Sequence, residues 1–393
     1  MIDSILIGMS GLNAYAEGLR VISNNASNLD TPGFKGSSLQ FGDMFYTQAG
    51  TNGSLDGQQG FGVDTLGTTL DFTAGDLQQT GNNLDLGVDG QGLFTLQDDH
   101  GALHYTRDGQ FTFDSSGVLV DKTDGDKVIG ISSAGAQGPM TLDGFRTNAP
   151  KATSTVVFSG NIPQSQPTVT LGTVNVLDSA GTAHALSLTL TSNQTTAPGV
   201  WNVVVDDGTT QVGTGTLAFP GGQIDPSRSK ITFNYQPAGQ PSQSVTLDFS
   251  SGVTSTTLSG ASTLVQASQD GYATGTLTGE SFDASGTLVY AYSNGQTTNG
   301  SRLLLARFDT TNAVASDGNN EFDATAPAQW HVGTAGDNGL GNIRSGVVEA
   351  SNVDLSQEFS ELVIMQRGYQ ASSEIVSTAN DMLQQLFSMS DGK

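Results

Sequence analysis

The two ends of this chain have the residue spacing of amphipathic helices, whereas the sequence between them is rich in Gly, Thr and Ser and is typical of β structure. Small or apolar residues recur at three- and four-residue intervals in both end segments. In the first segment they are Ile2, Ile5, Met9, Leu12, Ala16, Leu19, Ser23 and Ala26. In the last they are Leu355, Leu362, Met365, Tyr369, Val376, Ala379, Leu383 and Leu386. Neither stripe has enough neighbouring sequence to cover it, so the pattern predicts a polymer subunit whose terminal helices share one layer.

Composition narrows the class of protein. The formal net charge of -24, with 14 Lys and Arg against 38 Asp and Glu, argues against binding to nucleic acid or to an anionic membrane. Charged residues make up only 13% of the chain and there are 51 glycines, which favours a turn-rich β protein over a disordered acidic one. The absence of Cys excludes disulfides, thiolate metal sites and Cys catalysis.

The first residues do not resemble a secretory signal peptide. Asp3 stands where a basic region is required, and Gly8, Ser10 and Gly11 interrupt the apolar run. No run approaches the roughly 18 apolar residues of a membrane span. We therefore expect neither a cleaved leader nor membrane insertion.

The pattern along the chain predicts a mainly β, nested multidomain fold with α-helical termini. The paired N- and C-terminal helices would form an inner layer, with two β domains outward. The predicted parts are an inner helix over 1–30, an extended arm over 31–70, a discontinuous middle β domain over 71–154 and 273–350, an inserted outer β domain over 155–272, and a second inner helix over 351–393.

Alternating runs and turn clusters locate the strands of the two β domains. In the middle domain, turns are predicted at 98–101, 114–117 and 123–126, and later strands at 287–292 and 302–308 complete its sheet. In the inserted domain, strands are predicted at 168–176, 185–190, 201–205, 230–235 and 245–249.

The terminal helices carry two further signals. Asp354 is a predicted N-cap, with Gln357 placed to reach back as in a capping box. Four glycines interrupt the helices, each costing about 1 kcal/mol relative to Ala in an exposed helix. They are Gly8, Gly11, Gly18 and Gly368. We expect helices of this composition to fray in water.

Candidate metal and catalytic residues are few. His100 and His104 flank a turn beside Asp98 and Asp99, but no metal-ligand spacing accompanies them, and a solvated hairpin tip is the favoured interpretation. The acidic stretch at 121–126 lacks the bidentate Glu of a calcium loop and is interpreted as a turn. No nucleophile elbow, phosphate loop or dinucleotide fingerprint occurs, so no catalytic, cofactor or metal residue is predicted and an enzyme is not expected.

Three motifs resemble the signatures of the flagellar rod and hook axial proteins. The first is NNASNLDTPGFK at 24–35. The second combines GQGLF at 90–94 with YTRDGQF at 105–111, and the third combines EASNVDL at 349–355 with QRGYQ at 366–370. Their order matches that family, and the inserted domain resembles that of its hook members rather than the shorter rod members.

This resemblance implies a structural subunit of the hook, which would polymerise into a helical tube and act as a flexible universal joint that transmits motor torque to the filament. It implies a location in the hook and basal body of the bacterial flagellum, outside the cell after flagellar type III export. The implied partners are many copies of the chain itself, the rod, hook cap and hook-filament junction proteins, and the export apparatus.

The helical stripes and motif residues together give a predicted assembly interface. Its residues are Ile5, Met9, Leu12, Leu19, Asn25, Asn28, Pro32, Gly33, Phe34, Asn352, Asp354, Leu362, Met365, Tyr369, Val376, Leu383 and Leu386. Two alternatives remain open at this point: a distal rod-type axial protein of the same family, and a secreted β-rich adhesin whose terminal helices merely pack on each other.

Overall fold

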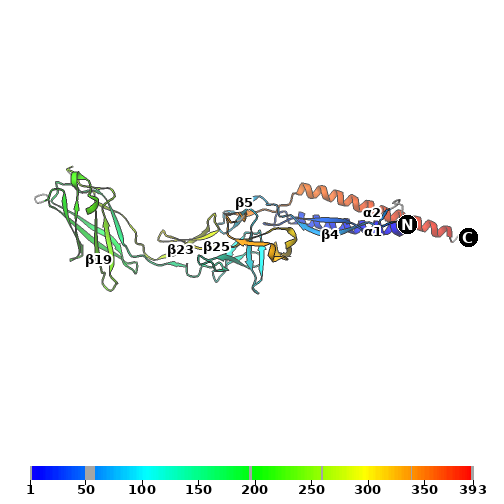
Figure 1. The fold of residues 1–393 in the computed structure, drawn as a ribbon, viewed down its shortest axis with the longest axis horizontal. Helices are drawn as coiled ribbons and strands as arrows, with labels where there is room; N and C mark the ends of the chain where they lie inside the picture. The colour runs from blue at the N-terminus through cyan, green and yellow to red at the C-terminus, as the bar shows by residue number, and fades with distance from the viewer. Residues whose placement is uncertain (1, 49–57, 194–196, 258–259, 338, 391–393) are drawn as a thin grey trace. The chain divides into compact units, whose positions relative to one another are not determined.

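A computed structural model describes residues 2–48, 58–193, 197–257, 260–337 and 339–390. The chain divides into two compact units (Figure 1). Unit 1 comprises Met1–Asp143, Glu280–Val289 and Asn299–Lys393, and unit 2 comprises Gly144–Gly279 and Tyr290–Thr298. No helix among the described residues has the length and apolar character needed to cross a membrane.

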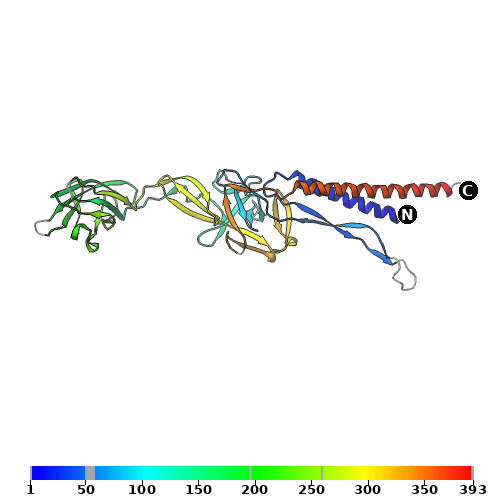
Figure 2. The same ribbon diagram turned by 90° about the horizontal axis from the view of Figure 1, so that it is seen from above.

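Both predicted terminal helices are present, in unit 1. Helix α1 spans Ile2–Ser27 and helix α2 spans Leu355–Ser390, and the two pack side by side (Figures 1 and 2). Asp354 caps α2 as predicted, because its Oδ1 accepts the backbone N–H of Ser356 at 2.7 Å. The predicted capping box is wrong: the side chain of Gln357 donates instead to Glu361 Oε1, one turn further along the helix.

An antiparallel ribbon follows α1 and runs back along it (Figure 2). Its strands are β1 (Ser37–Asp43), β2 (Tyr46–Gln48), β3 (Gln58–Gly60) and β4 (Val63–Leu70). The ring of Phe41 lies 5.9 Å from that of Tyr15 on α1, and Ser10 Oγ accepts the N–H of Val63. The predicted arm at 31–70 is therefore a hairpin on α1, apart from 49–57, which lie outside the described residues.

The body of unit 1 is an antiparallel sheet in the order β25-β11-β7-β8-β28-β27. β10 and β12 also pair with β11, and β9 pairs with β10. β26 pairs with both β7 and β29. The strands are β7 (Leu93–Gln97), β8 (Leu103–Thr106), β9 (Phe111–Phe113), β10 (Leu119–Asp121), β11 (Lys127–Ile131), β12 (Gln137–Pro139), β25 (Thr297–Leu303), β26 (Leu305–Phe308), β27 (Val314–Gly318), β28 (Glu321–Ala324) and β29 (Trp330–Gly333). The three predicted turns connect β7 to β8, β9 to β10 and β10 to β11, so these predictions are confirmed.

Two short ladders bring the end of the β region back to its beginning. β5 (Leu77–Gln79) pairs with β31 (Val347–Glu349), and β6 (Leu86–Asp89) pairs with β30 (Asn342–Ser345). Two 3-10 turns, η3 (Thr311–Ala313) and η4 (Pro327–Gln329), complete the described elements of this unit. Backbone hydrogen bonds from Gly33 N to Glu349 O and from Asn352 N to Phe34 O place the start of α2 beside the segment that leaves α1.

Unit 2 contains two sheets that enclose one apolar core (Figure 1, green). One has the order β15-β16-β17-β18, and the other β19-β20-β14-β21 with β22 beside β14. The strands are β14 (Thr155–Asn161), β15 (Thr168–Leu177), β16 (Ala183–Ser192), β17 (Val200–Asp207), β18 (Thr210–Ala218), β19 (Lys230–Tyr235), β20 (Gln243–Asp248), β21 (Val253–Thr254) and β22 (Val265–Gln269), with turns η1 (Pro220–Gly222) and η2 (Pro226–Arg228). Trp201, Phe158 and Phe249 are fully buried between the sheets.

The remaining strands pass through the division between the units. β13 (Thr147–Asn148) pairs with β23 (Gly275–Phe282), and β24 (Thr287–Tyr292) follows. The predicted fold class, mainly β with helical ends and more than one β domain, is confirmed. The five predicted domain ranges stay a prediction. The compact units divide near 143/144 and 279/280, whereas the predicted inserted domain begins at 155 and ends at 272.

Candidate assembly site

Glycines form the contact between α1 and α2. A Cβ built on Gly8 would lie 2.6 Å from Val376 Cγ2, and one on Gly11 would lie 2.7 Å from Ser372 Oγ. On the opposite helix, a Cβ on Gly368 would lie 2.5 Å from the ring of Tyr15. Side chains at these positions would hold the helices apart, so the glycines predicted only to weaken the helices are what lets them pack closely.

The sequence stripe on α1 is displaced by one residue from this contact. The buried residues of α1 are Gly8, Gly11, Ala14, Gly18, Ile22 and Asn25. Of the predicted stripe, Ile5, Leu12 and Leu19 are half-buried and Met9 is exposed. Glycine and alanine add little to a hydrophobic periodicity, so the predicted stripe followed the larger apolar residues next to them. Apart from Ile22, the larger apolar side chains of α1 therefore lie beside the contact or away from it.

On α2 the predicted stripe follows the contact more closely. Leu362, Met365, Val376 and Leu383 are half-buried along it, and the Met365 side chain packs on Gly18 of α1. Two further predicted residues, Tyr369 and Leu386, are exposed. Whether these residues contact another subunit stays a prediction.

Large apolar side chains face solvent along both helices. On α1 they are Ile2, Leu6 and Met9. On α2 they are Leu355, Phe359, Val363, Ile364, Tyr369, Ile375, Met382, Leu386, Phe387 and Met389. The exposed fraction is 63% for Ile364 and 69% for Phe387. An apolar surface of this extent is typical of an interaction surface rather than of a solvated helix.

Two asparagines tie the helices to the ribbon. The Asn25 side chain donates to Ser37 O at 2.8 Å and accepts the N–H of Ser37 at 3.1 Å. It also donates to Glu358 Oε1 in the first turn of α2, at 2.9 Å. Asn352 accepts the N–H of Gly36 and donates to Asp71 O, both at 2.8 Å. One amide from each terminal segment thus fixes the same stretch of backbone where β1 begins.

A buried ion network lies beside these amides. Lys35 Nζ is 2.5 Å from Glu349 Oε1, and Arg107 Nε is 2.9 Å from Glu349 Oε2. The side chain of Lys35 has no exposed surface, and that of Glu349 has 1%. Burial lowers the pKa of Lys35 and that of Arg107, and in both cases the Glu349 carboxylate opposes the shift.

Backbone carbonyls and amides complete the network. Lys35 Nζ donates to Thr73 O, and the Arg107 guanidinium donates to Gly90 O and Gly92 O. Glu349 Oε1 also accepts the N–H of Gly75 at 2.8 Å. These partners reduce the cost of burying three ionised groups, which is large when any of them is left unpaired.

The TPG turn packs directly on this network. Gly33 has a φ of +71°, and a Cβ there would lie 2.4 Å from the backbone N of Asp108. Its N–H donates to Glu349 O at 2.8 Å, and the preceding Pro32 O accepts from the Asn320 side chain at 2.9 Å. Glycine is required here both by the left-handed conformation and by the close approach of the backbone.

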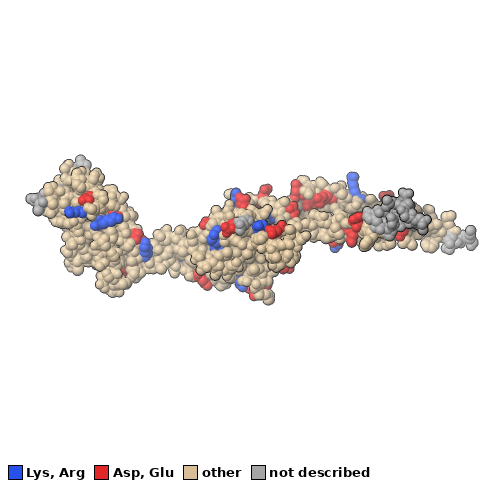
Figure 3. Space-filling model, in the orientation of Figure 1, with Lys and Arg blue, Asp and Glu red and all other residues tan. Residues whose placement is uncertain are grey.

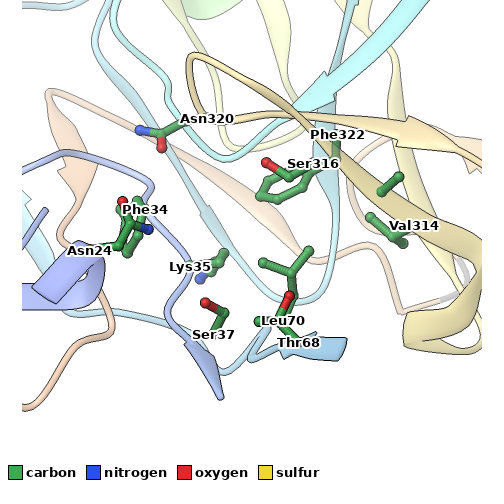
Figure 4. Close-up of a pocket in the computed structure, with 11 residues that line it drawn as sticks. Asn24, Phe34, Lys35, Ser37, Thr68, Leu70, Val314, Ser316, Asn320 and Phe322 are labelled. Atoms are coloured by element: carbon green, nitrogen blue, oxygen red, sulfur yellow. The ribbon is translucent and has the colours of Figure 1, made fainter. Parts of the chain in front are cut away.

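A cavity of about 380 Å³ opens next to Lys35 (Figure 4). Its walls come from the end of α1 (Asn24), the segment containing Phe34, β4 and the β27–β28 hairpin. Asn28, the remaining predicted interface residue, accepts the hydroxyl of Thr31 and holds the turn after α1. The polar members of the predicted interface therefore make contacts within this chain.

All three sequence motifs meet in the network. Lys35 belongs to the first, Arg107 and its two glycine partners to the second, and Glu349 to the third. None of the three charged residues was among the predicted site residues. The signal that could have found them is the presence of charged residues in all three motifs of a chain with only 13% charged residues.

Sequence models of four protein families match this chain. Their descriptions are flagella basal body rod protein (residues 5–35), flagellar hook protein FlgE/F/G D1 domain (87–172), flagellar basal body protein FlaE D2 domain (166–272) and flagellar basal body rod FlgEFG protein C-terminal (344–389). Together they describe the class of axial proteins of the flagellum, rod and hook alike.

Full-length relatives narrow this class. The flagellar hook protein FlgE of Escherichia coli (strain K12) is 32% identical over 97% of this chain and 98% of its own length. That of Borreliella burgdorferi is 30% identical over 98% of this chain and 99% of its own length. The chain belongs to the flagellar hook protein family. The crystal structure of Helicobacter pylori flagellar hook protein FlgE2 has a similar fold, with a TM-score of 0.50 at 13% identity, over 70% of this chain and all of that one.

Proposed function

We propose that this protein is the structural subunit of a bacterial flagellar hook, and that it polymerises into a helical tube that acts as a universal joint between motor and filament. The observation that carries the proposal is the exposed apolar surface of α1 and α2 in a chain related to hook proteins over almost its whole length. A surface of this kind needs a partner, and further copies of the same chain supply one.

The energetics favour burial in a polymer. Burying one Leu, Ile, Phe or Met side chain stabilises a structure by about 1.5–3 kcal/mol. The exposed residues of α1 and α2 would together supply a large driving force for head-to-tail contacts, which produce open helical polymers when the rotation does not close. The predicted assembly residues Ile5, Met9, Tyr369 and Leu386 belong to this proposed interface.

We assign different mechanical roles to the ion network and to the surface of the chain. Since Lys35, Arg107 and Glu349 link the segments after α1 and before α2 to the β body of unit 1, torque applied to the helices would reach that body through a rigid connection. Charged residues make up only 13% of the chain, and most of the face drawn in Figure 3 is uncharged. Gly, Ser, Thr and Asn there would make weak, exchangeable contacts that allow subunits to slide as the tube bends.

The proposal extends to the other parts of the flagellum. A subunit of this kind would leave the cell unfolded through the flagellar type III export apparatus. It would add beneath a hook cap, join the rod at one end and join the hook-filament junction proteins at the other. Membership of the family supports assembly into the flagellar axis. The structural character of this family supports a role other than catalysis.

The experiment replaces the chromosomal gene of the source bacterium with variants of this chain. Phe359→Ser and Ile364→Ser remove exposed apolar side chains of α2, and Val265→Ser removes one of similar exposure from unit 2. We expect the α2 variants to be exported but to give few or no hooks by electron microscopy and poor swimming, whereas the unit 2 variant assembles normally. Normal hooks from a doubly substituted α2 variant would contradict the proposal.

A further inference from the structure

Three side chains of the β body of unit 1 lie close to one another. His104 lies on β8, Asp126 immediately precedes β11, and Glu321 begins β28. The sheet order β11-β7-β8-β28 brings these positions together, with Glu321 opposite Thr106 and His104 opposite Leu96. A ring nitrogen and one oxygen from each carboxylate all lie within 4.8 Å of one another.

Glu321 is buried beside another carboxylate, Asp124, and one of its oxygens is left unpartnered within the described part of the chain. Its exposed fraction is 8%, and its Oε1 has no hydrogen-bond partner among the described residues. Burial and the nearby carboxylates Asp124 and Asp126 raise the pKa of Glu321 to about 8. Buried polar atoms are nearly always satisfied, so an unpartnered carboxylate oxygen that faces another carboxylate and an imidazole indicates a missing cation.

His104 is held as metal-binding histidines are held. Its Nδ1 lies 2.8 Å from Asp323 Oδ1, which leaves the other ring nitrogen, Nε2, for a ligand. Metal-bound histidines almost always donate the second ring N–H to a carboxylate or carbonyl, which fixes the tautomer and the ring orientation.

We propose that His104, Asp126 and Glu321 bind a divalent transition-metal ion, with zinc the best fit, and that Asp323 orients the imidazole. One nitrogen and two carboxylate ligands suit zinc, whereas calcium and magnesium prefer sites made of oxygen alone. Two atoms about 2.0–2.2 Å from a shared zinc ion lie at most about 4.4 Å apart, so ligand atoms within 4.8 Å of one another need only small movements to share one ion. Water would complete the coordination.

The ion would clamp three segments of unit 1 that are far apart along the chain. It would link the β10–β11 turn to β8 and β28, and would neutralise carboxylates that repel one another. The site does not depend on the hook assignment, because its ligands all belong to unit 1 of a single chain. The sequence could not indicate it, since Glu321 is almost 200 residues from Asp126 along the printed chain.

The test uses the full chain, dialysed against a chelator and then titrated by calorimetry with zinc, calcium or magnesium. We expect one zinc ion per chain and a zinc-dependent rise in the melting temperature of unit 1, with no comparable response to calcium or magnesium. Cobalt added in place of zinc should give visible absorption bands from a nitrogen and oxygen ligand set. Asp323→Asn should weaken zinc binding about 10–100-fold.

Two matched variants separate this site from adventitious binding. Glu321→Gln removes a ligand while keeping the shape of the side chain, and it relieves the repulsion that burdens the metal-free fold, so it should fold and fail to bind zinc. His331→Gln removes a surface histidine that also pairs with an aspartate, Asp309, at 2.9 Å. The His331→Gln variant should bind zinc with the affinity of the wild type. Equal zinc affinity in the wild type and Glu321→Gln, or no stoichiometric binding by the wild type, would overturn the proposal.

Discussion

Replacing Gly368 with alanine sets two effects of opposite sign against each other. In an isolated helix the change should stabilise α2 by about 1 kcal/mol, because Gly is the poorer helix former. In this structure the new Cβ would lie 2.5 Å from two carbons of the Tyr15 ring. The ring is held by its own contact with Phe41, so it cannot move away freely. Overpacking of this kind costs about 1–3 kcal/mol.

The contact between α1 and α2 should therefore lose up to about 2 kcal/mol. Since 1.4 kcal/mol is a factor of ten in an equilibrium constant, amide exchange in α1 should become up to about thirtyfold faster. Hydrogen exchange followed by mass spectrometry on the soluble chain measures this directly. The same variant should polymerise poorly.

Two controls make the result interpretable. Ser373→Ala changes an exposed neighbour on α2, so it tests helix propensity without a steric clash and should slow exchange slightly or leave it unchanged. Tyr15→Leu combined with Gly368→Ala should recover part of the lost protection, because the smaller side chain leaves room for the methyl group. If Gly368→Ala slows exchange as Ser373→Ala does, the helices do not pack through this contact and the reasoning is refuted.

Three further outcomes follow from the structure. Glu349→Gln should lower the free energy of unfolding of unit 1 by about 3–5 kcal/mol in urea titrations, because it leaves two buried cations without their carboxylate; a loss below about 1 kcal/mol would contradict the network. Burial opposes ionisation of Asp270, but hydrogen bonds from Ser154 and Thr155 hold its pKa at about 2. Its folded pKa is thus below its ordinary value of 3.8, so its stabilisation is present above about pH 3.8 and is lost toward pH 2, and Asp270→Asn should flatten the acid unfolding curve of unit 2 over that range. Replacing residues 155–272 with a short Gly/Ser bridge should leave a chain that still polymerises into tubes of altered curvature, and loss of all polymer from a folded deletion protein would contradict the proposed division of labour.

Elements with strong local signals were predictable from sequence. Asp354 marks the start of α2, and the acidic turns between β7 and β11 fall where the Asp and Gly clusters predict them. β18 shows the limit of such signals: it was not among the predicted strands, because its sequence contains two glycines. A Cβ on Gly213 would lie 2.7 Å from the ring of Phe233, and one on Gly215 would lie 2.6 Å from Ile231. The absence of a side chain at these glycines lets β18 pack closely on β19. A local sequence pattern does not indicate this contact.

The candidate site was predictable only in part, because its contacts join residues that are far apart along the chain. The motifs identified the segments that meet, but single residues within them acquire their roles from partners more than 200 positions away, as Lys35 does from Glu349. The helical stripe on α1 was predicted one residue out of place, since glycine contributes to a helix contact by the absence of a side chain. Long-range ion pairs and close backbone approaches are properties of the fold, and sequence periodicity does not encode them.

The central claim is that the exposed apolar faces of α1 and α2 are the surfaces through which the subunits assemble. A cryo-electron microscopy map of the hook polymer formed by this chain tests it most directly. The account predicts that α1 and α2 form the innermost layer of the tube, with Ile2, Leu6, Phe359 and Ile364 buried against neighbouring subunits. A polymer in which these side chains remain exposed to solvent, with the helices outside the subunit contacts, would contradict it.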